Sequence, residues 1–238
     1  MWDYLHGRGG WEIVERDDGY FDVSSGPECY LQPYERWPRH QQQAVALARG
    51  RVLDIGCGAG RVALFLQSKG LDATGVDISP LAIRTCRKQG LRKARVLPIS
   101  GIDSRLGTFD TLVMFGNNFG LLGNPGRARR LLRRFHKLTS PHGRIIAESL
   151  DPYVRRGRHA PVPEHLDYQR RNVRRGHLPG ELRFRIRYKR YCTPFFEYLI
   201  VSKHEMQQIV QGTGWRVTRF LDADSALYIA VLEKEPQS

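Results

Sequence analysis

Cysteine is scarce in this sequence. Its 238 residues include four cysteines, and none of them forms a CxxC pair or stands among histidines with metal-ligand spacing. A disulfide framework and a zinc site are therefore not expected, no metal is predicted, and a reducing compartment is favoured. The four are Cys29, Cys57, Cys86 and Cys192.

Long apolar runs are also missing. No stretch approaches the roughly 20 consecutive apolar residues that a membrane-spanning helix needs. The N-terminal residues lack the charged-then-apolar layout of a secretory signal. We therefore expect a soluble protein of the cytoplasm, without a membrane partner, as a monomer or a homodimer.

Acidic residues are outnumbered by basic ones. The chain has 38 Lys and Arg against 24 Asp and Glu, which gives a net charge of +14. One interpretation is an anionic partner such as RNA, and the other is arginine spread over solvated faces. The basic residues concentrate at 127–137, 155–175 and 183–190.

Strands and helices alternate through the middle of the chain. Short apolar runs are joined to helical segments by glycine-rich turns, which predicts a parallel, doubly wound sheet. Two final strands, 215–221 and 226–232, would close this sheet as an antiparallel hairpin. The fold class is thus α/β, Rossmann-like, with a seven-stranded mostly parallel sheet. The first five strands are expected at 51–55, 71–76, 94–98, 109–115 and 143–149.

We predict a single domain with elaborations. Residues 182–189 alternate apolar and basic side chains, which is typical of a half-buried antiparallel strand. It would belong to an inserted antiparallel lid rather than to a separate domain. The expected parts are an aromatic arm (1–37), a cofactor-binding core (38–150), the inserted lid or substrate segment (151–201), and a closing helix and hairpin (202–238).

A glycine loop follows the first predicted strand, where ligands bind in doubly wound sheets. It reads Asp54-Ile-Gly-Cys-Gly-Ala-Gly60 and is followed by Arg61. The nicotinamide fingerprint GxGxxG would need glycine at 61, and no Lys-Ser/Thr follows as in a phosphate-binding Walker loop. Asp54 would repel a pyrophosphate but suits a ligand with an ammonium group. Asp77, at the end of the second strand, suits a ribose diol.

Residues 52–61 and Gly75-Val-Asp-Ile-Ser-Pro80 resemble class I S-adenosylmethionine-dependent methyltransferases, as found among uncharacterised bacterial proteins. The resemblance covers about residues 40–150 and implies S-adenosylmethionine as cofactor and S-adenosylhomocysteine as product. It implies that Asp54 meets the methionine ammonium, that Asp77 takes the ribose diol and that Ile78 packs on adenine. The cofactor-binding residues we expect are Asp54, Gly56, Cys57, Gly58, Asp77, Ile78, Ser100, Gly101, Ile102, Gly116 and Asn117.

The acceptor side is less defined. The fourth strand ends in Phe115-Gly-Asn-Asn-Phe-Gly120, close to where the resemblance places the transferring methyl, although the prolines of amino-methylating relatives are missing. Asparagines in such a turn also have a purely structural use. As substrate-binding residues we expect Tyr30, Tyr34, Asn118, Phe195 and Tyr198.

Methyl transfer from a sulfonium needs alignment and exclusion of water more than a catalytic group. No catalytic residue is assigned; His159, His165, His204 and Tyr30 are conceivable bases, each more simply explained by packing or exposure. The predicted function is O- or N-methylation of a small molecule or peptide. The alternatives are an RNA methyltransferase that uses the basic lid, and a protein that binds S-adenosylmethionine without transfer.

Overall fold

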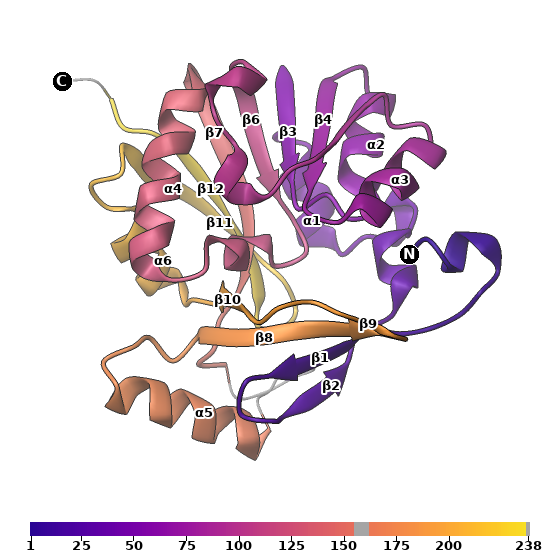
Figure 1. Ribbon diagram of the computed structural model, residues 1–238. Coiled ribbons are helices and arrows are strands. Elements are labelled where there is room, and N and C mark those ends of the chain that lie inside the picture. The colour runs from indigo at the N-terminus through magenta and orange to yellow at the C-terminus, as the bar shows by residue number, and fades with distance from the viewer. Residues whose placement is uncertain (155–161, 237–238) are drawn as a thin grey trace.

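A computed structural model describes residues 1–154 and 162–236, which form two β-sheets and six α-helices (Figure 1). The larger sheet has seven strands in the order β11-β12-β7-β6-β3-β4-β5. Strand β12 runs opposite to the other six, and it pairs antiparallel with both β11 and β7. The strands are β3 (Arg51–Ile55), β4 (Asp72–Asp77), β5 (Lys93–Val96), β6 (Phe109–Met114), β7 (Thr139–Leu150), β11 (Trp215–Asp222) and β12 (Leu227–Lys234). The predicted fold class is confirmed.

Strand order reverses between β3 and β6, which are hydrogen-bonded neighbours. The chain first moves outward from β3 to β4 and β5, then returns to the other side of β3. The carboxyl ends of β3 and β6 therefore flank the point at which such sheets open a crevice for ligands. The glycine loop and the Gly116 turn follow these two ends.

Helices cover both faces of the sheet because its buried strands present apolar side chains alternately to each side. Leu53 and Ile55 of β3 pack in the core shared with α4 and α6, whereas Val52 packs on the side of α1, α2 and α3. The helices are α1 (Arg39–Val45), α2 (Arg61–Ser68), α3 (Pro80–Lys88), α4 (Pro125–Leu138) and α6 (Lys203–Val210). Two packed layers thus fix the sheet edge that carries the site.

The second sheet is antiparallel and joins segments far apart in the sequence. Its order is β10-β8-β1-β2, with β9 paired to β8. The strands are β1 (Ile13–Arg16), β2 (Phe21–Val23), β8 (Glu181–Tyr188), β9 (Tyr191–Cys192) and β10 (Phe196–Leu199). The strand expected at 182–189 is therefore confirmed as β8. The hairpin β1–β2 was not predicted, because Phe21 and Val23 are exposed and leave no burial period in the sequence.

Helix α5 (Pro163–Arg174) was also not predicted. Its only buried residues are Tyr168 and Asn172, so it lacks the apolar stripe that identifies a helix in a sequence. Arg16 of β1 holds it instead. The Arg16 guanidinium donates to Glu164 O at 3.0 Å and to His165 Nδ1 at 2.9 Å, and stacks 4.3 Å from the Tyr168 ring centroid.

The second sheet lies against the carboxyl-end edge of the larger sheet, as Figure 1 shows. Tyr198 of β10 makes the contact: its ring fills the space beside Gly120, and its hydroxyl donates to Asn117 O at 2.5 Å. The arm and the insertion together therefore form one cover over the edge where the sites of doubly wound sheets lie. Among the described residues, no helix combines the length and apolar character needed to cross a bilayer.

Candidate functional site

The glycine loop is fastened to β4 by its own backbone. Gly56 N and Cys57 N donate to Val76 O at 2.9 and 3.0 Å, and Gly58 N donates to Asp77 Oδ2 at 3.0 Å. The Cys57 thiol points inward, where its Sγ lies 3.8 Å from Cys86 Sγ. Cys57 therefore serves the loop through its backbone, while its side chain packs under it.

Two glycines of the loop face different surroundings. Both have left-handed backbones, with φ of 72° at Gly56 and 55° at Gly58. A Cβ at Gly56 would lie 2.6 Å from Asn118 Nδ2, so this position is closed by the neighbouring turn. At Gly58 a Cβ would meet nothing nearer than Met1 Sδ at 3.6 Å, so a ligand can approach its backbone closely under the arm.

Asp54 is a buried carboxylate at the end of β3. It is 2% exposed, and its Oδ2 accepts from Ala63 N in the first turn of α2 at 3.2 Å. Burial raises the pKa of Asp54 to about 7, while the Ala63 N–H and the charge of Arg61 lower it. Such a carboxylate is stabilised in its ionised form by an incoming cation, which fits a ligand with an ammonium group.

Asp77 closes β4 with both oxygens already engaged. Oδ2 accepts from Gly58 N, and Oδ1 accepts from Ser79 N at 2.8 Å. Ser79 in turn caps α3 by accepting from Ala82 N at 3.3 Å. Each carboxylate oxygen keeps a further lone pair for a ligand hydroxyl. The next side chain, Ile78, is 71% exposed, which leaves an apolar surface beside Asp77 for a flat ring.

Two of the expected cofactor-binding residues, Ser100 and Gly101, lie in the short 3-10 turn Ile99–Gly101. Ser100 O accepts from Arg134 Nη1 at 2.6 Å, and the Ile102 side chain is fully buried in the core. Ile102 can therefore line a base only through its backbone. The nearby acid, Asp103, caps the next turn and pairs with Arg105 at 2.6 Å, so its charge is used locally.

Glu148 of β7 is a site residue that the sequence analysis missed. It is 1% exposed, and its Oε2 accepts from Gly116 N at 2.5 Å and Asn117 N at 3.0 Å. Its Oε1 accepts from His40 Nε2 at 2.9 Å and Gln41 Nε2 at 2.8 Å. Burial alone would raise the pKa of Glu148, but these donors hold it below its usual value. The signal was a single acid at the end of the apolar run Ile145-Ile-Ala147.

The two asparagines of the β6 turn have different partners. Asn118 Nδ2 donates to Ile55 O at 3.1 Å and Gly56 O at 2.8 Å, so this amide ties the turn to the glycine loop. Asn117 has a left-handed backbone, with φ of 63°, and its carbonyl accepts from Tyr198. Its buried Oδ1 has no hydrogen-bond partner among the described residues, so it offers an acceptor for a ligand donor.

Of the aromatic residues expected at the acceptor, Tyr30 and Tyr198 lie at this edge. Tyr30 is beside Gly58, and Tyr198 bonds the β6 turn. Burial and the nearby Tyr30 raise the pKa of Tyr198, so its phenol is a donor at neutral pH. Tyr34 instead stacks on Phe65 of α2 at 4.3 Å, and Phe195 lies 4.6 Å from the Arg185 guanidinium.

The two histidines considered as bases that the structure describes, His165 and His204, have other surroundings. His204 is exposed on α6, and His165 accepts from Arg16 at the α5 anchor. His159 lies outside the described residues. His40, which was not considered, is bound to Glu148. Across the part of the chain that the structure describes, no three His, Cys, Asp or Glu side chains are grouped to hold a metal ion.

The basic strand β8 is largely neutralised by the arm. Arg185 Nη2 lies 2.7 Å from Glu15 Oε1, Arg187 also pairs with Glu15, and Lys189 Nζ lies 2.5 Å from Asp3 Oδ2. These ion pairs within the chain are reason enough for arginines at these positions, so the arginines do not by themselves indicate an anionic ligand. Fewer cations along this strand are therefore left unpaired to bind a row of phosphate groups.

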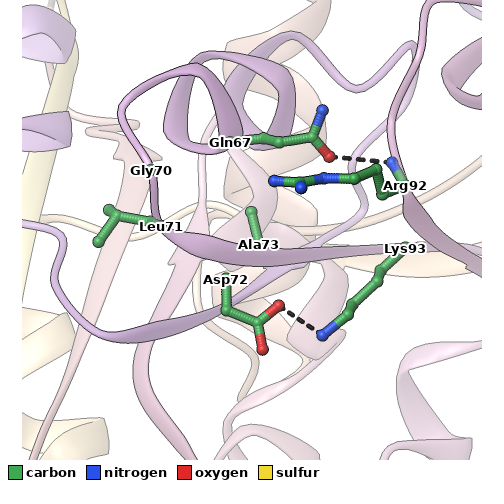
Figure 2. A pocket seen from close by; sticks show the side chains of 7 residues that line it. All are labelled: Gln67, Gly70, Leu71, Asp72, Ala73, Arg92 and Lys93. Carbon is green, nitrogen blue, oxygen red and sulfur yellow. Dashed lines mark hydrogen bonds and ion pairs between the residues drawn. The ribbon is translucent and has the colours of Figure 1, made fainter.

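A surface hollow of about 290 Å³ lies at the opposite edge of the sheet, between the amino ends of β4 and β5 (Figure 2). Its polar groups bond one another: Arg92 N donates to Gln67 Oε1 at 2.9 Å, and Lys93 pairs with Asp72 at 2.6 Å. Ligands of doubly wound sheets bind at the carboxyl ends of the strands, so this hollow is not the candidate site.

Comparison with known proteins agrees with the geometry of the glycine edge. Residues 52–143 match a family described as a methyltransferase domain. A solved S-adenosylmethionine-dependent methyltransferase from Bacteroides fragilis, in complex with S-adenosyl-L-homocysteine, is similar over 99% of this chain and 92% of that chain. Its TM-score is 0.81 at 24% sequence identity.

Two curated relatives match at similar identity. The glycine/sarcosine N-methyltransferase of Halorhodospira halochloris is 24% identical over 213 residues, which are 78% of this chain and 75% of that protein. A putative methyltransferase of Bacillus subtilis (strain 168) is 23% identical over 121 residues, which are 48% and 47% of the two chains. The match therefore spans about half the length of the latter protein.

Proposed function

We propose that this chain, which carries a class I S-adenosylmethionine-dependent methyltransferase domain, methylates a small molecule enclosed between the glycine edge and the cover formed by the arm and the insertion. The observation that carries the cofactor part is the Asp77 carboxylate. It is fixed by Gly58 N and Ser79 N, next to an exposed Ile78. This arrangement suits the ribose and base of a nucleoside.

The other end of the same edge fits an amino acid. Asp54 is buried, and burial raises its pKa to about 7, so its ionised form would gain from the ammonium group of a ligand. Gly58 leaves its backbone open to a ligand between these two acids. The residues at the edge therefore fit S-adenosylmethionine along its whole length, from adenine to the methionine ammonium.

S-adenosylmethionine supplies a methyl group on a positively charged sulfur, which is already activated for displacement. The chain's own task is to bind, orient and exclude water. Glu148 holds the Gly116–Asn117 backbone beside the glycine loop, and Asn118 locks the two segments together. Tyr198 donates to Asn117 O and so fixes the cover to the turn that faces the acceptor.

The side-chain oxygen Asn117 Oδ1 favours a methyl acceptor that carries an N–H or O–H group. This oxygen is buried and has no hydrogen-bond partner among the described residues. A buried hydrogen-bond acceptor without a donor destabilises a protein by about 1–3 kcal/mol, and a ligand that donates to it would remove this penalty. The curated relative named as a glycine/sarcosine N-methyltransferase is consistent with a small amine as acceptor. Whether the methyl group goes to nitrogen or oxygen would depend on whether an N–H or an O–H group of the substrate donates a hydrogen bond to Asn117 Oδ1.

The RNA alternative rests on the net charge of +14. The structure gives it less support than the sequence did, because Glu15 and Asp3 pair with Arg185 and Arg187 of β8 and with Lys189 directly after it, which leaves Arg183 as the fourth cation of this segment. On α4, Arg129 and Arg133 donate to carbonyls of Gln208 and Gly212, so these arginines also have structural partners.

The function is tested by following radiolabelled methyl transfer from S-adenosylmethionine. Glycine, sarcosine and a panel of small amines and alcohols form one arm, and total bacterial RNA forms the other. We expect label in the small-molecule arm, and a loss of turnover on Asn117→Ala. Label confined to RNA would replace the proposal with the alternative. Cofactor binding with no transfer to either arm after a broad panel would favour a binding protein.

A further inference from the structure

The buried carboxylate of Glu148 binds four hydrogen-bond donors. Its Oε1 accepts from His40 Nε2 at 2.9 Å and Gln41 Nε2 at 2.8 Å. Its Oε2 accepts from Gly116 N at 2.5 Å and Asn117 N at 3.0 Å. An ionised carboxylate offers about four lone-pair positions, so all of them are used. Glu148 therefore takes no proton from a methyl acceptor without breaking one of these bonds, and its role is to hold the groups around it.

The turn after β6 has the backbone geometry of an anion-binding nest. Gly116 and Asn117 are successive residues with left-handed backbones, at φ of 73° and 63°. Their two N–H groups converge on Oε2 of Glu148, as such nests converge on an anion. The last residues paired between β6 and β7 are Met114 and Ala147, so Glu148 follows directly and lies beside the turn. The carboxylate thus stabilises a backbone that asparagine adopts only at a cost.

His40 and Gln41 hold the other side of the carboxylate. Both lie in the first turn of α1, and both are buried. Arg61 Nη2 donates to Gln41 Oε1 at 2.9 Å. Because arginine only donates, the Gln41 oxygen faces Arg61 and its Nε2 faces Glu148. The ring proton of His40 is likewise on Nε2, since an ionised carboxylate only accepts. Two donors from one helical turn therefore fix the direction of the Glu148 carboxylate.

The same turn carries Asn117 Oδ1, the buried acceptor that has no hydrogen-bond partner among the described residues. Resting on the proposed function, we propose that His40 is a positioning residue for methyl transfer. It fixes Glu148, and Glu148 fixes the turn that aims Asn117 Oδ1 at the methyl acceptor. A buried histidine bonded to a buried acid can also serve stability alone. The two roles differ because positioning acts through Asn117, whereas stability does not.

The first test is a double-mutant cycle on kcat, with S-adenosylmethionine and the best acceptor of the amine and alcohol panel. His40→Leu should lower kcat about 10-fold, the size of one hydrogen bond to a charged group, and leave the affinity for S-adenosylhomocysteine within about twofold. His40→Gln, which keeps an N–H donor, should restore most of kcat. In the Asn117→Ala protein, His40→Leu should change kcat less than about twofold, because the side chain that it positions is gone.

The second test needs no acceptor. Hydrogen exchange of the Gly116 and Asn117 amides, followed by NMR, should be about 10-fold faster in His40→Leu than in the wild type and near the wild-type rate in His40→Gln. His136→Leu is the matched control. His136 packs on the ring of Trp215, which begins β11 at the amino-end edge of the sheet. This change should leave kcat and both exchange rates unaltered.

Multiplied losses of kcat in the double variant, or unchanged amide exchange in His40→Leu, would overturn the inference in favour of a purely stabilising role. A parallel loss of S-adenosylhomocysteine affinity would overturn it in favour of a role in cofactor binding. A wild type that methylates no member of the panel would instead reject the proposed function. The exchange rates would still decide whether His40 holds the turn.

Discussion

At the residue scale, the two acids of the glycine edge carry most of the account. Asp54 and Asp77 stand at the ends of neighbouring strands, and both are held by backbone N–H groups of the loops around them. Burial raises the pKa of both. Each therefore costs free energy when ionised in the empty protein, and each gains when a ligand supplies a cation or hydroxyl donors.

Asp77 makes the sharper prediction for binding. Asp77→Ala should weaken S-adenosylhomocysteine binding about 100-fold or more, because two hydrogen bonds to a charged acceptor are lost. Asp72→Ala is the control, since Asp72 begins the same strand but faces solvent and pairs with Lys93. Titration calorimetry measures both. Equal affinity of the Asp77 variant and the wild type would reject the ribose assignment.

Asp54 predicts a proton released on binding. Below pH 7 a large share of Asp54 is protonated, because its pKa is about 7, and an incoming ammonium favours the ionised form. Binding at pH 6 should therefore release a proton and strengthen as the pH rises toward 7. Calorimetry in buffers of different ionisation enthalpy counts that proton. Asp54→Asn should abolish the release, and a release that survives this change would point to another group.

At the element scale, the second sheet and α5 show what anchors the cover. Arg16 is 6% exposed and binds Asp18, His165 and the Glu164 carbonyl together. Since α5 buries few apolar side chains, this arginine takes the place of a hydrophobic stripe. The helix should therefore depend on one polar cluster rather than on distributed packing.

Removing the cluster's centre tests this dependence. Arg16→Met should lower the free energy of local unfolding of α5 by about 3 kcal/mol, as expected when a sheltered charge pair is broken. Hydrogen exchange of the α5 amides measures it. Arg170→Met is the control, because Arg170 only pairs with Asp167 on the exposed surface, where such pairs contribute less than about 1 kcal/mol. Similar protection in both variants would contradict the anchoring role.

The same cluster predicts a pH dependence. Burial and the charge of Arg16 lower the pKa of His165 below the usual histidine value of 6.5. The unfolded segment thus takes up a proton before the folded one does. Stability from this group is complete above pH 6.5 and declines as the pH falls through that value. Corrected exchange rates at pH 7.5 and 5.5 should show the decline in the wild type. His165→Gln should remove it.

Elements could be predicted from the sequence where buried side chains make apolar residues recur at regular spacing. Elements without such spacing could not. The strands of the large sheet were located to within a few residues because their apolar side chains must meet two helical layers. Strands β1 and β2 and helix α5 carry almost no buried apolar residues, so their pairing depends on contacts such as Arg16 to His165 that sequence spacing does not reveal.

The residues of the candidate site also fall into those that could be predicted from the sequence and those that could not. Asp54, Gly58 and Asp77 follow one strand or loop each, so their positions could be inferred from motif spacing. Glu148 and His40 meet across 108 positions of sequence, and Tyr198 meets Asn117 across 81. Such contacts are set by strand order and by the seating of the second sheet. A lone acid in an apolar strand was the only local indication of Glu148.

At the scale of the whole molecule, charge and architecture point to different partners. A net charge of +14 favours weak association with any polyanion, whereas the cover over the glycine edge favours a small acceptor. We expect RNA binding that is detectable at about 50 mM salt and lost by about 200 mM, as for sequence-independent phosphate contacts. A filter-binding series in salt measures it. Affinity that persists at the higher salt would support an RNA acceptor.

We expect the glycine edge to bind S-adenosylmethionine. Titration calorimetry of the folded wild-type chain with S-adenosylmethionine tests it most directly, with a far-ultraviolet circular dichroism spectrum to establish that the protein is folded. We expect saturable binding at one site per chain, competed by S-adenosylhomocysteine. A folded protein that gives no heat and no competition at millimolar ligand would contradict it.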